Sequence, residues 1–91
     1  MLNSALTTIQ NSLGLHARPA MAFVDAANGF ECEVRVRRTD GDETVDGKSI
    51  MQMLLLAATQ GPELEITCDG SDASKALAAL LRLVEAKFDE E

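Results

Sequence analysis

The feature that most constrains this chain is a strict alternation of apolar and polar residues in two short segments. Residues 63–68 read Glu-Leu-Glu-Ile-Thr-Cys, and residues 32–37 read Cys-Glu-Val-Arg-Val-Arg. Successive side chains of a β-strand point to opposite faces of the sheet, so both segments predict strands with one apolar and one wet face. Such faces are typical of antiparallel sheets, because parallel sheets are buried on both sides. We therefore expect an antiparallel sheet with helices stacked on its apolar face and water on the other.

The remaining segments complete an α+β element order. Apolar residues at helical spacing, bounded by turn residues such as Gly29 and Gly61, predict helices over Ala17–Asn28, Lys48–Ala58 and Ala73–Phe88. Two more strands are expected over Leu2–Ile9 and Glu43–Asp46. The second is the acidic arm of a hairpin that turns at Asp40-Gly41, which is typical of a protected sheet edge. The order is then βαββαβα, with Gly70-Ser71-Asp72 supplying a cap for the last helix.

Length and charge limit the class of protein. The 91 residues suffice for one modest core, so we expect a single domain over residues 1–91. The 15 acidic side chains against 8 basic ones give a net charge of -7, which argues against nucleic-acid binding. No apolar run reaches the ~18 residues of a membrane span, and the first ten residues do not resemble a signal peptide. We therefore expect a cytoplasmic protein without membrane insertion. No metal or cofactor is expected either, and Cys32 and Cys68 have no companions that would make a zinc site.

His16, the only histidine, stands where the first predicted helix begins. A helix start offers unpaired backbone N–H groups and a partial positive charge, so it binds anions such as phosphate. Arg18 adds a guanidinium that pairs with phosphate oxygens, and Gly14 lets the backbone approach the anion. Pro19 fixes the first turn without losing a hydrogen bond. An ordinary solvated histidine fits the spacing too, but together these residues make His16 a candidate for phosphorylation.

The order of residues around His16 is more specific than the spacing. Residues 14–20 read Gly-Leu-His-Ala-Arg-Pro-Ala, followed by Lys-Ser-Ile-Met at 48–51, Gln-Gly at 60–61 and Gly-Ser-Asp-Ala at 70–73. This pattern resembles the HPr family of phosphocarrier proteins of the bacterial phosphoenolpyruvate-dependent phosphotransferase system, over about residues 6–88. The resemblance implies an HPr-like open-faced β-sandwich, in which four antiparallel strands in the order 1-4-2-3 are covered on one face by three helices.

The resemblance also implies a role for each residue of the site. His16 would accept a phosphoryl group from Enzyme I at its Nδ1 and pass it to an EIIA-type acceptor. Arg18 would neutralise charge on that group, and the start of the helix at Ala17 and Arg18 would bind the phosphate. The protein would then be a phosphoryl carrier and not an enzyme. We expect a monomer, because His16 must be exposed to its partners in turn.

The helix expected over Lys48–Ala58 carries two further expectations. Ser49 matches the serine that HPr kinase/phosphorylase modifies in many bacteria, where a phosphate adds nearly two negative charges. An ordinary helix cap explains Ser49 equally well. Four residues match the positions by which the family meets its partners, namely Lys48, Ile50, Met51 and Leu54. On the same helix, two residues are expected in the core, namely Met53 and Leu56.

The family's strand order makes segments 32–37 and 63–68 antiparallel neighbours. An in-phase register would pair Val34 with Ile66, Val36 with Leu64 and Cys32 with Cys68. The two thiols would then touch on the covered face, although a disulfide is not expected in a reducing cytosol. On the open face, two ion pairs would form between facing residues, namely Arg35 with Glu65 and Arg37 with Glu63.

The branch of the family and the exact role stay open. Leu13 replaces the Asn or Ser that is common three residues before the histidine in sugar-type HPr. Residues 11–16 and the acidic residues 89–91 look more like the nitrogen-related branch, NPr, whereas residues 46–51 look like kinase-regulated HPr. A regulatory module that only binds partner proteins would share the fold, but such paralogues usually lack the histidine. A small enzyme with His16 as general base is disfavoured, because no partnered nucleophile, metal cluster or cofactor motif accompanies it.

Overall fold

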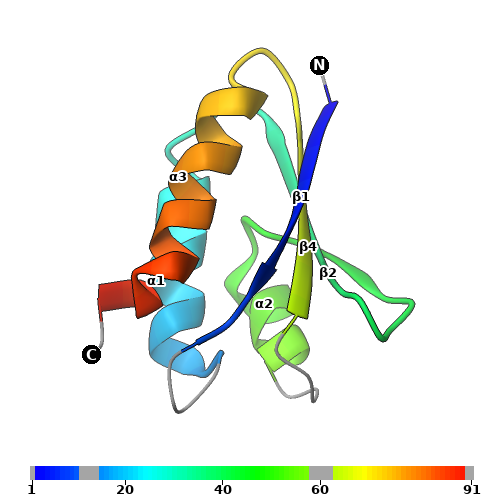
Figure 1. Cartoon of the computed structure of the whole chain (residues 1–91), viewed down its shortest axis with the longest axis vertical. Coiled ribbons are helices and arrows are strands. Elements are labelled where there is room, and N and C mark those ends of the chain that lie inside the picture. Colours follow the sequence, from blue (N-terminus) through cyan, green and yellow to red (C-terminus); the bar gives the residue numbers. More distant parts are fainter. Residues whose placement is uncertain (1, 11–14, 58–62, 90–91) are drawn as a thin grey trace.

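Four antiparallel strands form one sheet, and three helices cover one of its faces, in the computed structural model of the chain (Figure 1). The structure describes residues 2–10, 15–57 and 63–89, and the elements named here lie within them. In chain order these elements are β1 (Leu2–Thr8), α1 (Ala17–Ala27), β2 (Glu33–Arg38), β3 (Thr44–Asp46), α2 (Ile50–Ala57), β4 (Glu63–Asp69), α3 (Ala73–Glu85) and a short 3-10 turn, η1 (Lys87–Asp89). The sheet order is β1-β4-β2-β3. The expected element order, strand order and one-sided helix layer are confirmed.

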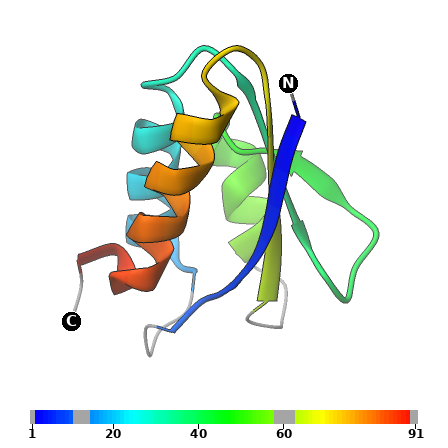
Figure 2. The same ribbon diagram turned by 45° about the horizontal axis from the view of Figure 1, so that its top comes forward.

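The apolar residues of β2 and β4 form the floor of the core. Val34, Val36, Leu64 and Ile66 are 1% exposed or less, and they alternate with polar residues on the open face. The helices stand together over that floor (Figure 2), and four of their side chains are equally inaccessible to water, namely Phe23, Met53, Leu80 and Val84. Removing apolar surface from water stabilises the fold by roughly 25 cal/mol per Å². The alternation that predicted the sheet is therefore also what holds the helices on it.

Strand β1 differs from the other long strands in what it sends to each face. Its large apolar residues Leu2 and Leu6 are 65% and 59% exposed on the open face. The smaller Asn3, Ala5 and Thr7 are half-buried beneath α3. Short side chains at these positions let α3 lie close to the strand. The expectation that apolar residues gather on the covered face is therefore wrong for β1.

The register between β2 and β4 is shifted by two residues from the predicted one. Val34 lies opposite Cys68 and Val36 lies opposite Ile66. A shift of two residues keeps every side chain on its own face, so the hydrophobic pattern alone cannot distinguish the two registers. The cause lies before the strand: the backbone N–H groups of Glu31 and Cys32 donate to the carboxylate of Asp72, at 2.8 and 2.9 Å. This contact holds Cys32 outside the ladder, and β2 begins only at Glu33.

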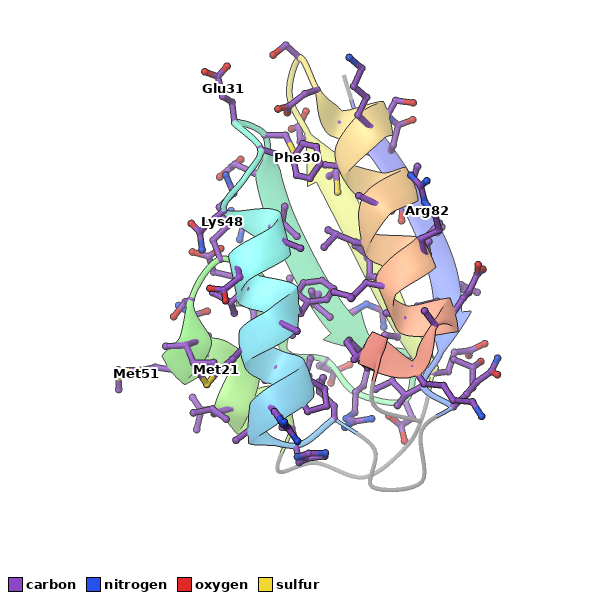
Figure 3. The ribbon with its side chains drawn as sticks, turned by 90° about the vertical axis from the view of Figure 1, so that its left-hand side faces the viewer. Met21, Phe30, Glu31, Lys48, Met51 and Arg82 are labelled. Atoms are coloured by element: carbon purple, nitrogen blue, oxygen red, sulfur yellow. The ribbon has the colours of Figure 1, made fainter. Side chains whose placement is uncertain are left out.

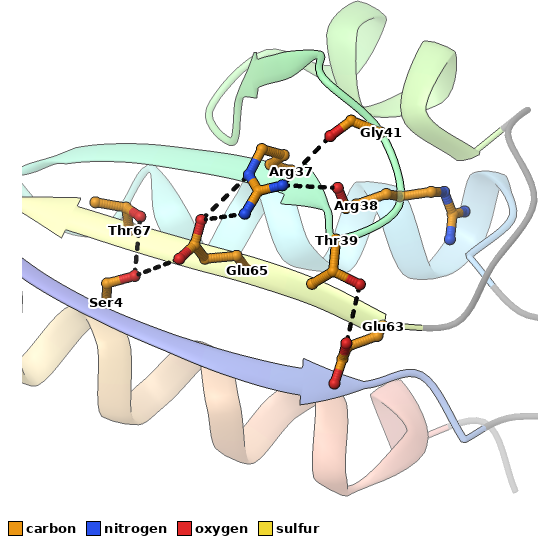
Figure 4. Close-up of polar contacts among 8 residues, drawn as sticks. All are labelled: Ser4, Arg37, Arg38, Thr39, Gly41, Glu63, Glu65 and Thr67. Carbon is orange, nitrogen blue, oxygen red and sulfur yellow. Dashed lines mark hydrogen bonds and ion pairs between the residues drawn. The ribbon is translucent and has the colours of Figure 1, made fainter.

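The shifted register rearranges the charges on the open face. Arg37 lies opposite Glu65 and forms a two-pronged ion pair with it, at 2.9 and 3.2 Å (Figure 4). Arg35 lies opposite Thr67 and pairs instead with its own strand neighbour Glu33, at 3.4 Å. Glu63 accepts a hydrogen bond from the hydroxyl of Thr39, at 2.9 Å. The expected ladder of Arg35 with Glu65 and Arg37 with Glu63 is therefore wrong.

The two cysteines nevertheless both lie in the core. Cys32 and Cys68 are 2% and 0% exposed and carry free thiols, and each thiol influences the pKa of the other. Burial raises the pKa of Cys68 to about 12, and burial together with Asp72 raises the pKa of Cys32. The two buried thiols therefore lie near one another, although the register from which their contact was predicted is wrong.

The two ends of α3 also depart from prediction. Asp72 occupies the cap position but makes no side-chain bond to its helix, because its carboxylate holds Glu31 and Cys32. At the other end the helix stops at Glu85, not at Phe88. Lys87 and Phe88 take the left-handed conformation, with φ of 57° and 56°. The turn carries the Phe88 ring back into the core, where the side chain is 6% exposed.

Candidate functional site

His16 is the N-cap residue of α1. Its backbone is extended (φ -98°, ψ -168°), and its carbonyl accepts the first helical hydrogen bond, from Ala20 N–H at 3.0 Å. The imidazole makes no capping bond to the helix. Buried residues on both sides position it: Leu15 is 5% exposed, and Pro19 and Ala20 are buried in the first turn. The half-buried ring is thereby held at the helix start. Gly14, expected to shape this loop, is outside the described residues.

The start of α1 offers two backbone donors next to His16. Pro19 has no N–H, and the N–H of Ala20 is already bonded. The N–H groups of Ala17 and Arg18 remain, and no acceptor for either occurs in the described part of the chain. Both residues are exposed. Unpaired N–H groups at a helix start attract anions, since the helix dipole places positive charge there.

The guanidinium of Arg18 adds a full positive charge two residues from His16 in sequence. The side chain is exposed, and no carboxylate among the described residues pairs with it. An unengaged guanidinium is well suited to two-pronged contact with a phosphoryl group. Imidazole, two N–H groups and a guanidinium therefore converge on one short segment, which is suited to holding a phosphoryl group.

Ser49 directly precedes α2 and caps it. Its hydroxyl oxygen accepts a hydrogen bond from Gln52 N–H at 3.3 Å, and its carbonyl accepts one from Met53 N–H at 2.9 Å. The side chain of Gln52 reaches back to accept from Asp46 N–H at 2.8 Å. The carboxylate and carbonyl of Asp46 in turn accept from the backbone N–H groups of Lys48 and Ser49. The capping role of Ser49 is confirmed.

Lys48 does not extend freely toward a partner. Its ammonium donates to the carbonyl of Phe30 at 2.6 Å, and its own carbonyl accepts from the side chain of Asn28 at 3.1 Å. Both acceptor and donor come from the segment that follows α1, so Lys48 ties the end of α1 to the start of α2. Figure 3 shows Lys48 and Phe30 on neighbouring segments at that end of the helix pair.

The expected docking residues differ in exposure. Met51 is 76% exposed and Leu54 is 41% exposed, while Ile50 is half-buried against the core. Met53 and Leu56 are buried, as expected. Sequence reasoning missed Met21 of α1, which is 55% exposed and lies on the same side of the molecule as Met51 (Figure 3). We call Met21, Ile50, Met51 and Leu54 the α1–α2 patch.

Sequence reasoning also missed Leu55 of α2, which is 69% exposed. Both missed residues are large apolar side chains outside the buried stripe of their helix, and that signal is visible in the sequence. Within the described residues, no group of three or more His, Cys, Asp or Glu side chains could hold a metal ion. None of the described helices is both long and apolar enough to cross a bilayer.

Comparison with known proteins agrees with this geometry. A family model described as "PTS HPr component phosphorylation site" matches residues 4–86. The phosphocarrier protein HPr of Pseudomonas aeruginosa is 47% identical over 83 residues, which is 91% of each chain. The phosphocarrier protein NPr of Escherichia coli is 37% identical over 83 residues, again 91% of each chain. The crystal structure of an HPr from Thermoanaerobacter tengcongensis has a TM-score of 0.87 at 37% identity and matches over 98% of each chain.

Proposed function

The chain belongs to the HPr family of phosphocarrier proteins of the phosphotransferase system, and on that premise we propose that it carries a phosphoryl group on His16. The group comes from phospho-Enzyme I and goes to an EIIA-type acceptor. The observation that supports this most directly is the position of His16 as N-cap of α1, with the N–H groups of Ala17 and Arg18 beside it.

The transfer is a nucleophilic displacement at phosphorus. The lone pair of the unprotonated Nδ1 of His16 forms the new P–N bond, while the bond from phosphorus to the donor breaks and its electron pair stays with the donor. The reverse step hands the group to the acceptor in the same way. His16 supplies only the nucleophile, so alignment and charge neutralisation by the partner provide the catalysis. The protein is then a carrier and a substrate, not a catalyst.

Arg18 and the helix start stabilise the charge of the phosphoryl group. The guanidinium neutralises part of it, and the N–H groups of Ala17 and Arg18 bind its oxygens. Hydrogen bonds to an ionised group are the stronger kind, at about 1.5–3 kcal/mol each. They need no reorganisation, because buried residues on both sides already fix the backbone at this point.

The α1–α2 patch docks the partners. Its exposed Met51 and Leu54 give apolar surface next to α1, and methionine adapts to partners of different shape. Lys48 fits less well in this role, because its ammonium is already bonded to Phe30. Cytoplasmic Enzyme I and EIIA domains must reach His16 in turn, so we place the protein in the cytoplasm as a monomeric single domain.

Ser49 is a second phosphorylation site in this proposal. Its hydroxyl stands at the start of α2, next in sequence to Ile50 and Met51 of the patch. A phosphate on Ser49 adds nearly two negative charges there, which weakens apolar docking. Because the start of α2 also accommodates anions, HPr kinase/phosphorylase could modify Ser49 without unfolding the helix.

Intact mass after incubation with phosphoenolpyruvate and a bacterial Enzyme I tests the carrier proposal. The expected result is a gain of one phosphate that mild acid removes. His16→Ala abolishes the gain, and Ser49→Ala keeps it. No gain with several Enzyme I preparations would overturn the carrier role and favour a module that only binds partner proteins. An acid-stable gain with the kinase and ATP, lost in Ser49→Ala, tests the second site separately.

A further inference from the structure

A groove lies between the β2–β3 hairpin and α2. Its volume is about 580 Å³, and it is open to solvent on one side. It is lined by Arg38, by residues 40–45 of the hairpin and by Gln52, Leu55 and Leu56 of α2. No residue of α1 lines it, and in both ribbon views the hairpin turn and α1 lie at opposite sides of the picture, with α2 and the strands between them (Figures 1 and 2). The groove is therefore distinct from the His16 site.

Aliphatic side chains form the floor and one wall of the groove. Val45 and Leu56 are 7% and 4% exposed and belong to the core. Leu55 stands beside them and is 69% exposed. Covering a leucine that is this exposed is favourable by the hydrophobic effect. An aliphatic group placed in the groove would contact Leu55 from one side and Val45 from the other.

Carboxylates surround the mouth of the groove. Asp40, Asp42 and Glu43 are all exposed. Asp40 attracts the guanidinium of Arg38, and Asp42 and Glu43 form no hydrogen bond or ion pair within the described part of the chain. Among the described residues of the lining, Arg38 is the one basic side chain. Its buried guanidinium donates to the carbonyl of Leu56, at 3.3 and 3.4 Å. Three carboxylates against one cation leave the groove acidic.

The acidic turn is held in place. A guanidinium nitrogen of Arg37 donates to the carbonyls of Arg38 and Gly41, at 3.3 Å each (Figure 4). The N–H of Gly41 donates to the carbonyl of Arg38 at 3.1 Å. These bonds order the backbone that carries Asp40 and Asp42, so a ligand need not order it on binding.

We propose that this groove docks a basic, leucine-bearing segment of a partner protein. The aliphatic side chain of the segment packs against Leu55, Leu56 and Val45, and its lysines or arginines face the carboxylates of the turn. Charge selects this occupant, because an acidic segment or a free phosphate would be repelled. Leu55 follows Met51 by one helical turn, so the groove continues the α1–α2 patch. The proposal does not depend on phosphorylation of His16.

The proposal is tested with a short fluorescent peptide of leucine and lysine and the whole protein. Fluorescence measures the affinity, and changes in the amide NMR shifts of the protein locate the binding site. We expect shifts centred on residues 40–45, Leu55 and Leu56, with affinity that falls as salt rises. Leu55→Ser should weaken binding about tenfold. The matched control is Leu6→Ser, which changes a similarly exposed leucine on the open sheet face and should bind as well as wild type.

A second pair of variants tests the charge. Asp40→Asn with Asp42→Asn should weaken binding and flatten its salt dependence, whereas Asp25→Asn with Glu85→Gln changes net charge equally and should not. The proposal is overturned if a peptide with glutamate in place of lysine binds as well, or if the shifts gather on the α1–α2 patch. The proposal is also overturned if spermidine produces the same shifts and Leu55→Ser does not affect them, because the groove would then bind cations only.

Discussion

The starts of α1 and α2 differ in what the side chain of the cap residue does. At α1 the N-cap side chain of His16 makes no capping bond, and two backbone N–H groups remain without acceptors among the described residues. At α2 the side chain of Ser49 accepts from Gln52 N–H, and the side chain of Gln52 accepts from Asp46 N–H. The N–H groups of Ile50 and Met51 also have no acceptor among the described residues. The two helix starts therefore differ in the cap side chain, which bonds to its helix at α2 and does not at α1.

Only α2 is stabilised by its cap side chain. A capping side chain stabilises a helix by about 1 kcal/mol, and α1 lacks that contribution. Its cap residue, His16, is instead the residue that we propose to be phosphorylated. Buried Leu15 and Ala20 on both sides hold the helix start without a cap. A phosphoryl group at His16 would complete the capping of α1 from outside.

The sharpest test of this comparison exchanges the two cap residues for alanine. We expect His16→Ala to lose phosphoryl transfer completely, because it removes the nucleophile, and Ser49→Ala to retain it. Intact mass after reaction with Enzyme I reads both outcomes, and circular dichroism checks that both variants are folded. Transfer that survives in His16→Ala would place the phosphoryl group elsewhere and end the functional contrast between the two helix starts.

Arg18→Ala should slow transfer by about 10- to 100-fold, because a charge-assisted contact worth about 1.5–3 kcal/mol is lost. Arg82→Ala is the matched control, since Arg82 is an exposed arginine on α3 that points away from α1 (Figure 3). Rapid-quench transfer rates from phospho-Enzyme I measure both. Equal rates for the two variants would show that the helix start alone stabilises the phosphoryl group.

Most of the fold was predictable from the hydrophobic periodicity and the turn residues. Features that depend on contacts between residues distant in sequence were not. The alternation in β2 and β4 gave the sheet and its buried face. The register was wrong because a shift of two residues preserves that alternation. What decides it is the bond from Cys32 N–H to Asp72, 40 residues away in sequence. The left-handed turn at Phe88 was missed for a similar reason, since the helical period continues through that residue.

The candidate site was predictable to the extent that it is local. His16, Ala17 and Arg18 are consecutive, so one helix start brings them together. Lys48 was expected to face partners, but a long side chain can turn inward, and only the fold reveals the carbonyl of Phe30 within its reach. Met21 and Leu55 were missed because, in helices rich in apolar residues, periodicity alone does not separate exposed apolar side chains from those of the core.

Ser49→Ala should lower the free energy of unfolding by about 1 kcal/mol, since Gln52 N–H loses its acceptor. Ser49→Asp should keep most of the stability, because aspartate also caps helices, while its charge weakens binding to Enzyme I. Urea unfolding and titration calorimetry separate the two effects. Ala17→Ser at α1 is the comparison variant. It should change stability less, because Ala17 is exposed and follows the cap residue. Equal losses would contradict the view that the two helix starts are built differently.

A third helix start, that of α3, gives the smallest effect and extends the comparison. The carboxylate of Asp72 leaves its own helix to accept from Glu31 and Cys32, and these hydrogen bonds lower its pKa. A carboxyl with a lowered pKa stabilises the fold above its ordinary pKa, and that stabilisation is lost as pH falls through the lowered value. Wild type should therefore exceed Asp72→Asn in stability at neutral pH, and the gap should close below about pH 4. Urea unfolding across that range measures it. Asp25→Asn, an exposed carboxylate on α1, is the control and should show no such gap. If the difference in unfolding free energy did not depend on pH, Asp72 would act by its shape and not by its charge. The start of β2 would then be set by packing of the loop at Cys32.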